Sequence, residues 1–260
     1  MSEQKRRMPN PPPPPPAIAL SASLSFLLSR KVLLGWSLLL VVVTVALTWL
    51  GFLLTTGALD SLTGSFFETA PIHDSWWEWI KYAGWLVGKY LFILVSRIVA
   101  FFLAFLLAYT LTTPFYGFLS NAAEKLYWGE QFDEDDGFSL AGIAKDLFEG
   151  LKIALFGLVV TVIALLIGFV PVIGQISVFL IYTYYSALMF IDYPASRRRW
   201  GLGRKLSWLR NHGGHSFRLG LIPAAIGMLP VLNIFLMALI FPLFTVHAAL
   251  NFSAVEKHRR

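Results

Sequence analysis

Ser29, Arg30 and Lys31 stand immediately before the longest uncharged stretch of this chain, Val32 to Leu59. If a helix begins here, its first backbone N–H groups have no partner inside the helix and carry the positive end of the helix dipole. Two adjacent cations at such a start can bind a dianion through charge, dipole and hydrogen bonds. They can equally set membrane topology and contact lipid phosphate. The residues alone leave both interpretations open.

Arg97 is a second candidate anion contact, near the middle of an apolar segment that runs from about Tyr82 to Leu111. A central arginine costs about 2.5 to 3.5 kcal/mol on the translocon insertion scale. No acidic residue lies within any apolar run to pair with it. We therefore expect Arg97 to face water on an anion path. The alternative is that it binds carbonyl groups of a hairpin, or extends its charged end to the interface.

The composition predicts the environment in which these cations act. The 260 residues are 57% hydrophobic, 15% aromatic and only 14% charged, which is more apolar surface than a soluble domain of this size can bury. The run from Val32 to Leu59 exceeds the roughly 20 residues that cross a bilayer, and it lacks a cleavage site, so it is expected to be a retained anchor. The sequence predicts an all-α integral membrane protein.

Three regions follow from the distribution of polar residues. Residues 1–23 are predicted to be a disordered, basic and proline-rich cytoplasmic tail, residues 24–252 a single membrane domain, and residues 253–260 a basic cytoplasmic tail. Basic residues also crowd the segment from Pro194 to Arg218, whereas the tryptophan-rich loop around Trp76 has only Lys81. The positive-inside rule places both termini and the 194–218 segment in the cytoplasm. Its cations are expected to meet anionic lipid headgroups rather than nucleic acid.

Two related stretches, GFVPVIGQI at 168–176 and GMLPVLNIF at 227–235, occur 59 positions apart. Proline at Pro171 and Pro230 favours a turn, and Gly174 or Asn233 tolerates the left-handed conformation that closes it. Each repeat is therefore a predicted helical hairpin. Because the tips offer only Gln175 and Asn233 as polar side chains, they are expected to stop inside the membrane, where protein or a watery cavity must cover their backbone. Two ordinary spanning hairpins are the alternative.

Amphipathic helices are predicted at the exit of the second apolar segment. Behind Pro114 and Gly117, apolar residues recur at helical spacing up to Tyr127, and again from Phe138 to Leu151. We expect these helices to lie on or just outside the bilayer. The fold is thus predicted as two long transmembrane helices, two helical hairpins and amphipathic cytoplasmic helices.

The ordered set of motifs resembles the CysZ-type sulfate permease family, which is related to the etoposide-induced membrane proteins of eukaryotes. The set comprises a basic pair before the first span, TTPFYGFLSNAAEKL after the second, FVPVIG and IDYP in one hairpin, and MLPVLN in the other. The resemblance covers about 25–252. It implies a bacterial inner-membrane homo-oligomer that passes sulfate inward for cysteine biosynthesis, with hairpins that enter the membrane only partly.

One departure from the family concerns the anion site. The family's Gly-Leu-Arg-Arg motif corresponds here to Leu28, Ser29, Arg30 and Lys31, so the cations are retained and the glycine is not. A side chain at the glycine position restricts how closely the backbone approaches an oxyanion.

We predict a permease for sulfate or a related oxyanion. GWLVGK at 84–89 is one residue too short for a phosphate-binding loop, so ATP coupling is not expected. Neither an enzyme site nor a cofactor is expected, and His212 with His215 supplies only two metal ligands. A membrane scaffold or lipid-interacting protein of the same family is the alternative.

Overall fold

The computed structural model describes residues 17–72, 74–132, 140–229 and 232–259, and every regular element in these ranges is a helix. The elements are α1 (Leu20–Ser29), α2 (Lys31–Thr63), η1 (Gly64–Phe67), α3 (Trp76–Trp128), η2 (Gly129–Gln131), α4 (Leu140–Gly168), α5 (Ile173–Arg197), α6 (Leu202–Asn211), α7 (Gly213–Gly227) and α8 (Leu232–Arg259). The all-α prediction is confirmed. Most of the predicted N-terminal tail, the acidic run 133–136 and Pro230 lie outside the described residues.

Five helical stretches in the described ranges are long and apolar enough to cross a membrane. They are Lys31–Phe67, Trp76–Gln131, Phe148–Gly168, Ile173–Arg197 and Leu232–His258. α7 has only 15 residues, or about 22 Å at 1.5 Å per residue, which is less than a hydrocarbon core of about 30 Å. The two helices that follow each other as α7 and α8 therefore differ: α8 is long enough to cross a membrane, and α7 is not.

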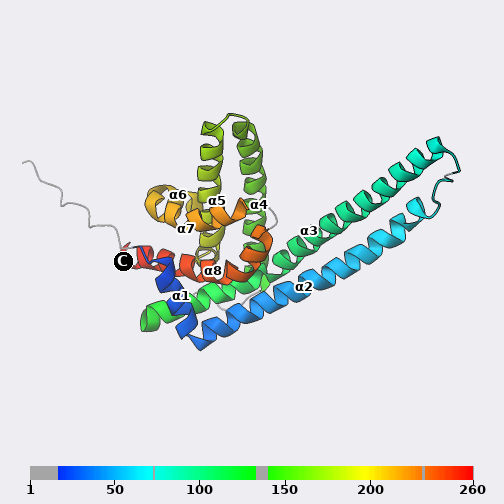
Figure 1. Cartoon of the computed structure of the whole chain (residues 1–260). Coiled ribbons are helices and arrows are strands. Elements are labelled where there is room, and N and C mark those ends of the chain that lie inside the picture. Colours follow the sequence, from blue (N-terminus) through cyan, green and yellow to red (C-terminus); the bar gives the residue numbers. More distant parts are fainter. Residues whose placement is uncertain (1–16, 73, 133–139, 230–231, 260) are drawn as a thin grey trace, which may run out of the picture.

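α2 and α3 form a long antiparallel hairpin that projects from the rest of the molecule (Figure 1). Ala100, Ala104 and Ala108 recur every four residues along the buried face of α3. The small side chains let the two backbones approach closely: a Cβ on Gly51 would lie 3.1 Å from the Cβ of Ala104. This is the close packing of small residues expected between helices in a bilayer. A capping box, in which Ser75 and Glu78 exchange hydrogen bonds, begins α3.

α3 continues through Pro114 as one helix of 53 residues, so the separate amphipathic helix predicted behind that proline is wrong. Proline removes one helical hydrogen bond, but packing on neighbouring helices can retain the helical path. Here the residues that follow are among the most buried of the chain, including Tyr116 and Leu119. Their burial keeps α3 helical through the position where a proline would otherwise end it.

The two repeats lie where α4 gives way to α5 and where α7 gives way to α8. α7 crosses close to α5 at Gly220. A Cβ at this position would overlap the carbonyl oxygen of Thr183, so only glycine permits the close approach. Phe241 of α8 lies at the centre of the core and contacts Tyr116 and Phe190 at ring-centroid distances of 4.6 and 4.8 Å. The core thus joins one helix from each of the three hairpins.

Buried ion pairs connect the basic segment after α5 to the rest of the fold. Arg197 and Arg198 both bind Glu124 of α3, at 3.0 and 3.1 Å, and the Glu124 side chain is fully buried. The ammonium of Lys205 in α6 is likewise fully buried and binds Asp192 at 2.5 Å. Three of the cations that the sequence assigned to lipid headgroups are therefore internal. Their acidic partners, Glu124 of α3 and Asp192 of α5, lie inside the fold and hold the cations there.

α1 packs on the C-terminal half of α8 through a polar cluster. The side-chain amide of Asn251 accepts from the backbone N–H of Ile18 at 2.9 Å and donates to its carbonyl at 3.2 Å. Ser23 lies 2.8 Å from Nδ1 of His247. Asn251 and Asp192 occupy equivalent positions, 59 residues apart, in the two repeats. Each repeat thus anchors a short helix at the same place on its second arm.

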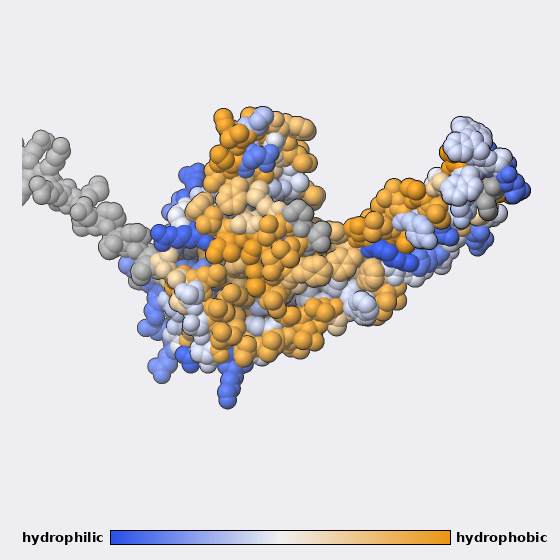
Figure 2. Space-filling view, viewed as in Figure 1, coloured by the Kyte–Doolittle hydropathy of each residue, from blue (hydrophilic) through white to orange (hydrophobic). Residues whose placement is uncertain are grey.

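Apolar side chains cover most of the visible surface of the hairpins, and polar ones gather at two ends (Figure 2). One polar region surrounds the C-terminus, α1 and α6, and the other lies at the far end of the α2–α3 hairpin. A band of apolar surface between two polar ends is what a membrane-embedded protein presents. Within the hairpins, large apolar residues such as Leu54, Leu94 and Leu158 are more than half exposed.

Candidate anion-binding site

The boundary between α1 and α2 is a sharp break at Arg30. Its backbone is extended, with φ −108° and ψ 103°, so it ends α1 and begins α2 at once. Its carbonyl accepts the first hydrogen bond of α2, from the N–H of Leu34 at 3.0 Å. Because no side chain caps this helix start, the N–H groups of Lys31, Val32 and Leu33 precede the first internal donor, and the exposed residues Lys31 and Val32 can offer theirs to a ligand.

The three predicted residues lie together and are exposed at this break. The hydroxyl of Ser29 donates to the carbonyl of Phe26 at 3.0 Å, and the guanidinium of Arg30 lies 5.7 Å from the centroid of the Phe26 ring. Neither Arg30 nor Lys31 forms an ion pair with a described acidic residue. Two open cations beside free N–H groups, at the positive end of a 33-residue helix, favour a doubly charged oxyanion.

Arg97 does have an acidic partner, so the premise that none is available is wrong. Its Nη2 lies 2.8 Å from Oδ2 of Asp60, and the two side chains are 35% and 61% exposed. Asp60 follows the first apolar run directly, and the antiparallel hairpin brings it alongside Arg97. The other terminal nitrogen, Nη1, is buried without a hydrogen-bond partner among the described residues. Arg97 therefore keeps one buried donor that no described residue satisfies.

The structure does not bring Arg97 to Arg30 and Lys31. Asp60 and Lys31 lie near opposite ends of α2, about 40 Å apart at 1.5 Å per residue. Arg97 instead neighbours the second hairpin tip, because Phe101, one turn further along α3, stacks on Phe235 with 6.0 Å between ring centroids. The predicted cations form two separate positions on one hairpin.

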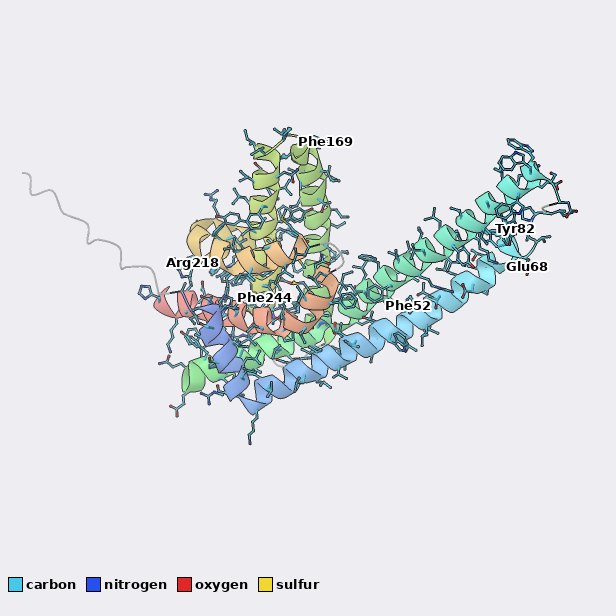
Figure 3. The ribbon with its side chains drawn as sticks, in the orientation of Figure 1. Phe52, Glu68, Tyr82, Phe169, Arg218 and Phe244 are labelled. Carbon is cyan, nitrogen blue, oxygen red and sulfur yellow. The ribbon has the colours of Figure 1, made fainter. Side chains whose placement is uncertain are left out.

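The first hairpin tip closes differently from the prediction. Val172, and not Gly174, has a positive φ, 63° with ψ −63°, and the N–H of Ile173 donates to the carbonyl of Pro171 at 2.7 Å, which is a γ-turn. Gly174 is already helical, and it is needed for a different reason: a Cβ there would overlap the carbonyl oxygen of Ile167. Figure 3 places Phe169 at this tip, far from Phe244 in the body, and the Phe169 side chain is 84% exposed.

The two tips share a hydrogen-bond arrangement in spite of their different sequences. The amide of Gln175 donates to the carbonyl of Gly168 at 3.2 Å, and the amide of Asn233 donates to the carbonyl of Gly227 at 2.9 Å. Gly168 and Gly227 are equivalent positions that end the first arm of each hairpin. The polar side chains at the tips thus satisfy backbone carbonyls of their own hairpin. The two tips lie apart, since the second contacts α3 whereas the first projects freely (Figure 1).

Buried hydroxyl groups between the two cationic positions were missed by sequence reasoning. Ser37 on α2 and Ser120 on α3 bury hydroxyl oxygens with no hydrogen-bond partner in the described part of the chain, and the buried hydroxyls of Thr44 on α2 and Tyr116 on α3 lie against each other. Hydroxyls seven residues apart in an apolar run lie on one helix face, and that spacing was the available signal. A buried hydroxyl without a partner costs about 1 to 3 kcal/mol, so these groups are candidate donors to water or an anion.

Apolar helices, paired helical hairpins and a basic helix start together define a multi-pass, α-helical membrane protein. The family model described as "Sulfate transporter CysZ/Etoposide-induced protein 2.4" matches residues 19–238. The chain belongs to this family, as the sequence motifs predicted. The family is one of transporters, which agrees with the prediction that the chain is not an enzyme.

Several bacterial proteins named "Sulfate transporter CysZ" are similar to this chain at modest identity. The protein of Pseudomonas fluorescens strain Pf0-1 is 27% identical over 167 residues, which cover 62% of this chain and 66% of the relative. The protein of Pseudomonas aeruginosa strain LESB58 is 26% identical, covering 62% and 67% of the two chains. That of Salmonella typhimurium is 27% identical over 188 residues, covering 69% and 70%. The matched regions span about two thirds of the relatives.

Proposed function

We propose that this protein is an ATP-independent permease of the bacterial inner membrane that passes sulfate or a related oxyanion toward cysteine biosynthesis. Its family, and relatives whose names state sulfate transport, support this activity. The observation that carries it is the uncapped start of α2, where Arg30 and Lys31 have no acidic partner in the described residues. Such a position suits a dianion better than a neutral solute.

The proposed binding mode uses three groups at the break before α2. Arg30 and Lys31 supply charge, the free N–H groups of the first turn donate hydrogen bonds, and Ser29 supplies a hydroxyl once it turns away from the carbonyl of Phe26. The backbone at Arg30 is extended, so the neighbouring N–H groups are presented without the glycine of the family motif. That geometry offsets the loss of glycine at this site.

Arg97 is the proposed second contact, toward the other end of the α2–α3 hairpin. Asp60 stabilises the guanidinium in an apolar region and still leaves Nη1 without a partner in the described residues. A dianion would meet one positive and one negative side chain here, so binding should be weaker than at Arg30. Weak binding at Arg97 would let the anion leave this position and move on along the path.

We further propose that α2 and α3 span the membrane and that the α7–α8 hairpin enters it only partly. The 15-residue length of α7 supports partial entry, because a full crossing needs about 20 residues. Tips whose amide side chains satisfy their own carbonyls tolerate an apolar surrounding. In this arrangement the hairpins form the constriction around the anion path. The chain is also proposed to act as a homo-oligomer.

The topology can be tested by labelling single introduced cysteines. The basic residues place the termini and the 194–218 segment in the cytoplasm and the tryptophan-rich loop outside. Cysteine at Ser65, which is exposed in η1, should react with an impermeant thiol reagent on intact cells. Cysteine at Ser2 or at Ser207 in α6 should react only after the membrane is permeabilised. The opposite labelling would reverse the model.

The transport function can be tested by uptake of radiolabelled sulfate into liposomes that contain the purified protein and no ATP. Wild-type protein should admit sulfate, and Arg30→Ala and Arg97→Ala should each slow its uptake. Arg218→Ala is the matched control, because it removes an exposed cation that forms no ion pair in the described residues. No uptake by a folded wild-type protein would favour the scaffold or lipid-interacting alternative.

A further inference from the structure

A groove of about 320 Å³ lies where α4, α5 and α6 meet, away from both cationic positions. Its lining includes Phe156 and Val160 of α4, Ile181 and Leu188 of α5, and Leu206 and Leu209 of α6. The volume is at the lower end of small-molecule sites, roughly 300 to 1,000 Å³. Only Tyr184 and Tyr185 bring polar atoms to the wall. A surface this apolar suits a hydrocarbon chain and does not suit an oxyanion.

The groove follows the axis of the α4–α5 hairpin. Its residues on α5 recur over successive turns, from Leu180 through Tyr184 to Leu188, which spans about 12 Å along the helix. Both arms of this hairpin are long and apolar enough to cross a membrane. An acyl chain that lies along a membrane helix therefore runs in the direction of the groove. Leu180 and Tyr184, 41% and 39% exposed, stand on its open side.

Two cations lie beside the groove, Arg210 on α6 and Lys152 on α4. Arg210 follows Leu206 by one helical turn and is exposed, with no ion pair to a described acidic residue. Lys152 precedes Phe156 by one turn on α4, pairs with Glu149 at 2.6 Å, and has a side chain that is 42% exposed. Residues four apart on a helix are neighbours on its surface. Arg210 and Lys152 thus each lie one helical turn from a residue that lines the groove.

We propose that this groove binds one acyl chain of an anionic phospholipid, whose phosphate contacts Arg210 with Lys152 at the α4 side. The charge beside the groove fits a headgroup, and the apolar length fits the chain that follows it. A bound lipid of this kind fills the space between the first hairpin and α6.

The test measures lipid retention by the full chain, independently of transport. The protein is reconstituted into vesicles of equal parts phosphatidylglycerol and phosphatidylcholine, extracted with mild detergent and examined by native mass spectrometry. Wild type should retain one phosphatidylglycerol per chain. Leu180→Trp, which covers the groove at its exposed mouth, and Val160→Phe, which fills its floor, should each lose that lipid. Arg210→Gln should retain a lipid but lower the preference for phosphatidylglycerol by up to about fivefold.

Leu158→Trp is the matched control for the groove variants. Leu158 is also on α4 and 64% exposed, but it does not line the groove, so this variant should retain lipid as the wild type does. Equal retention by Leu180→Trp and Leu158→Trp would overturn the proposal. So would an unchanged lipid preference in Arg210→Gln. Conversion of a dimer to monomers by Leu180→Trp, without loss of lipid, would assign the groove to a second copy of the chain instead.

Discussion

Replacing Asp192 with alanine is expected to destabilise the protein by about 3 to 5 kcal/mol, because it leaves a fully buried ammonium without its carboxylate partner. Among the described residues, Nζ of Lys205 otherwise donates only to the hydroxyl of Ser196, at 3.2 Å. A neutral hydroxyl does not replace the lost charge. Thermal unfolding of the purified protein in detergent, followed by intrinsic fluorescence, measures the effect.

A double variant separates loss of the ion pair from loss of packing. Asp192→Ala combined with Lys205→Met removes both charges and keeps the long side chain, so it should be more stable than Asp192→Ala alone. Arg218→Ala, which removes an exposed cation, should change stability by less than about 0.5 kcal/mol. If Asp192→Ala unfolds like the wild type, Lys205 is not held by this pair.

Replacing Arg30 with alanine is expected to weaken sulfate binding by about ten- to a hundredfold, because a hydrogen bond to a charged group contributes roughly 1.5 to 3 kcal/mol. Arg30 is exposed, and its guanidinium lies over the ring of Phe26 without an ion pair to a described acidic residue, so the fold should survive. Arg30→Lys should recover part of the affinity, since charge returns without the two-pronged guanidinium. Calorimetric titration with sulfate measures each affinity.

Salt and stability measurements complete this test. Binding at an exposed helix start should weaken as neutral salt is added, because salt screens exposed charges. Each variant should unfold at the wild-type temperature. Arg218→Ala should bind sulfate as the wild type does. If Arg30→Ala folds normally and binds sulfate with unchanged affinity, the start of α2 is not the anion site.

Local features of the fold could be predicted because their causes are local. The apolar runs and the two prolines at equivalent positions indicated the membrane helices and the hairpin turns. The turn geometry could not be predicted in the same way, because either Val172 or Gly174 can close such a turn and packing decides between them. The carbonyl of Ile167 leaves no room for a side chain at Gly174, and this contact comes from the opposite arm.

The charged residues show the limits of sequence reasoning more clearly. Arg97 and Asp60 are 37 residues apart, and only the antiparallel register of α2 and α3 makes them neighbours. Lys205 resembles the other cations of its segment in sequence, yet it is fully buried beside Asp192. By contrast, Arg30 and Lys31 were predicted correctly as neighbours at a helix start, because adjacent residues need no tertiary information.

The unbroken path of α3 has a mechanical consequence. Glu124, held by two arginines near one end, and Trp76 at the other belong to the same 53-residue helix. The rise of 1.5 Å per residue separates them by about 70 Å, so a rotation of about 5° at the ion pair displaces the tryptophan end by about 6 Å. If α3 turns as a rigid helix about the ion pair, its tryptophan end therefore moves furthest. Any shift of the basic segment that holds Glu124 is therefore amplified at the tryptophan end of α3.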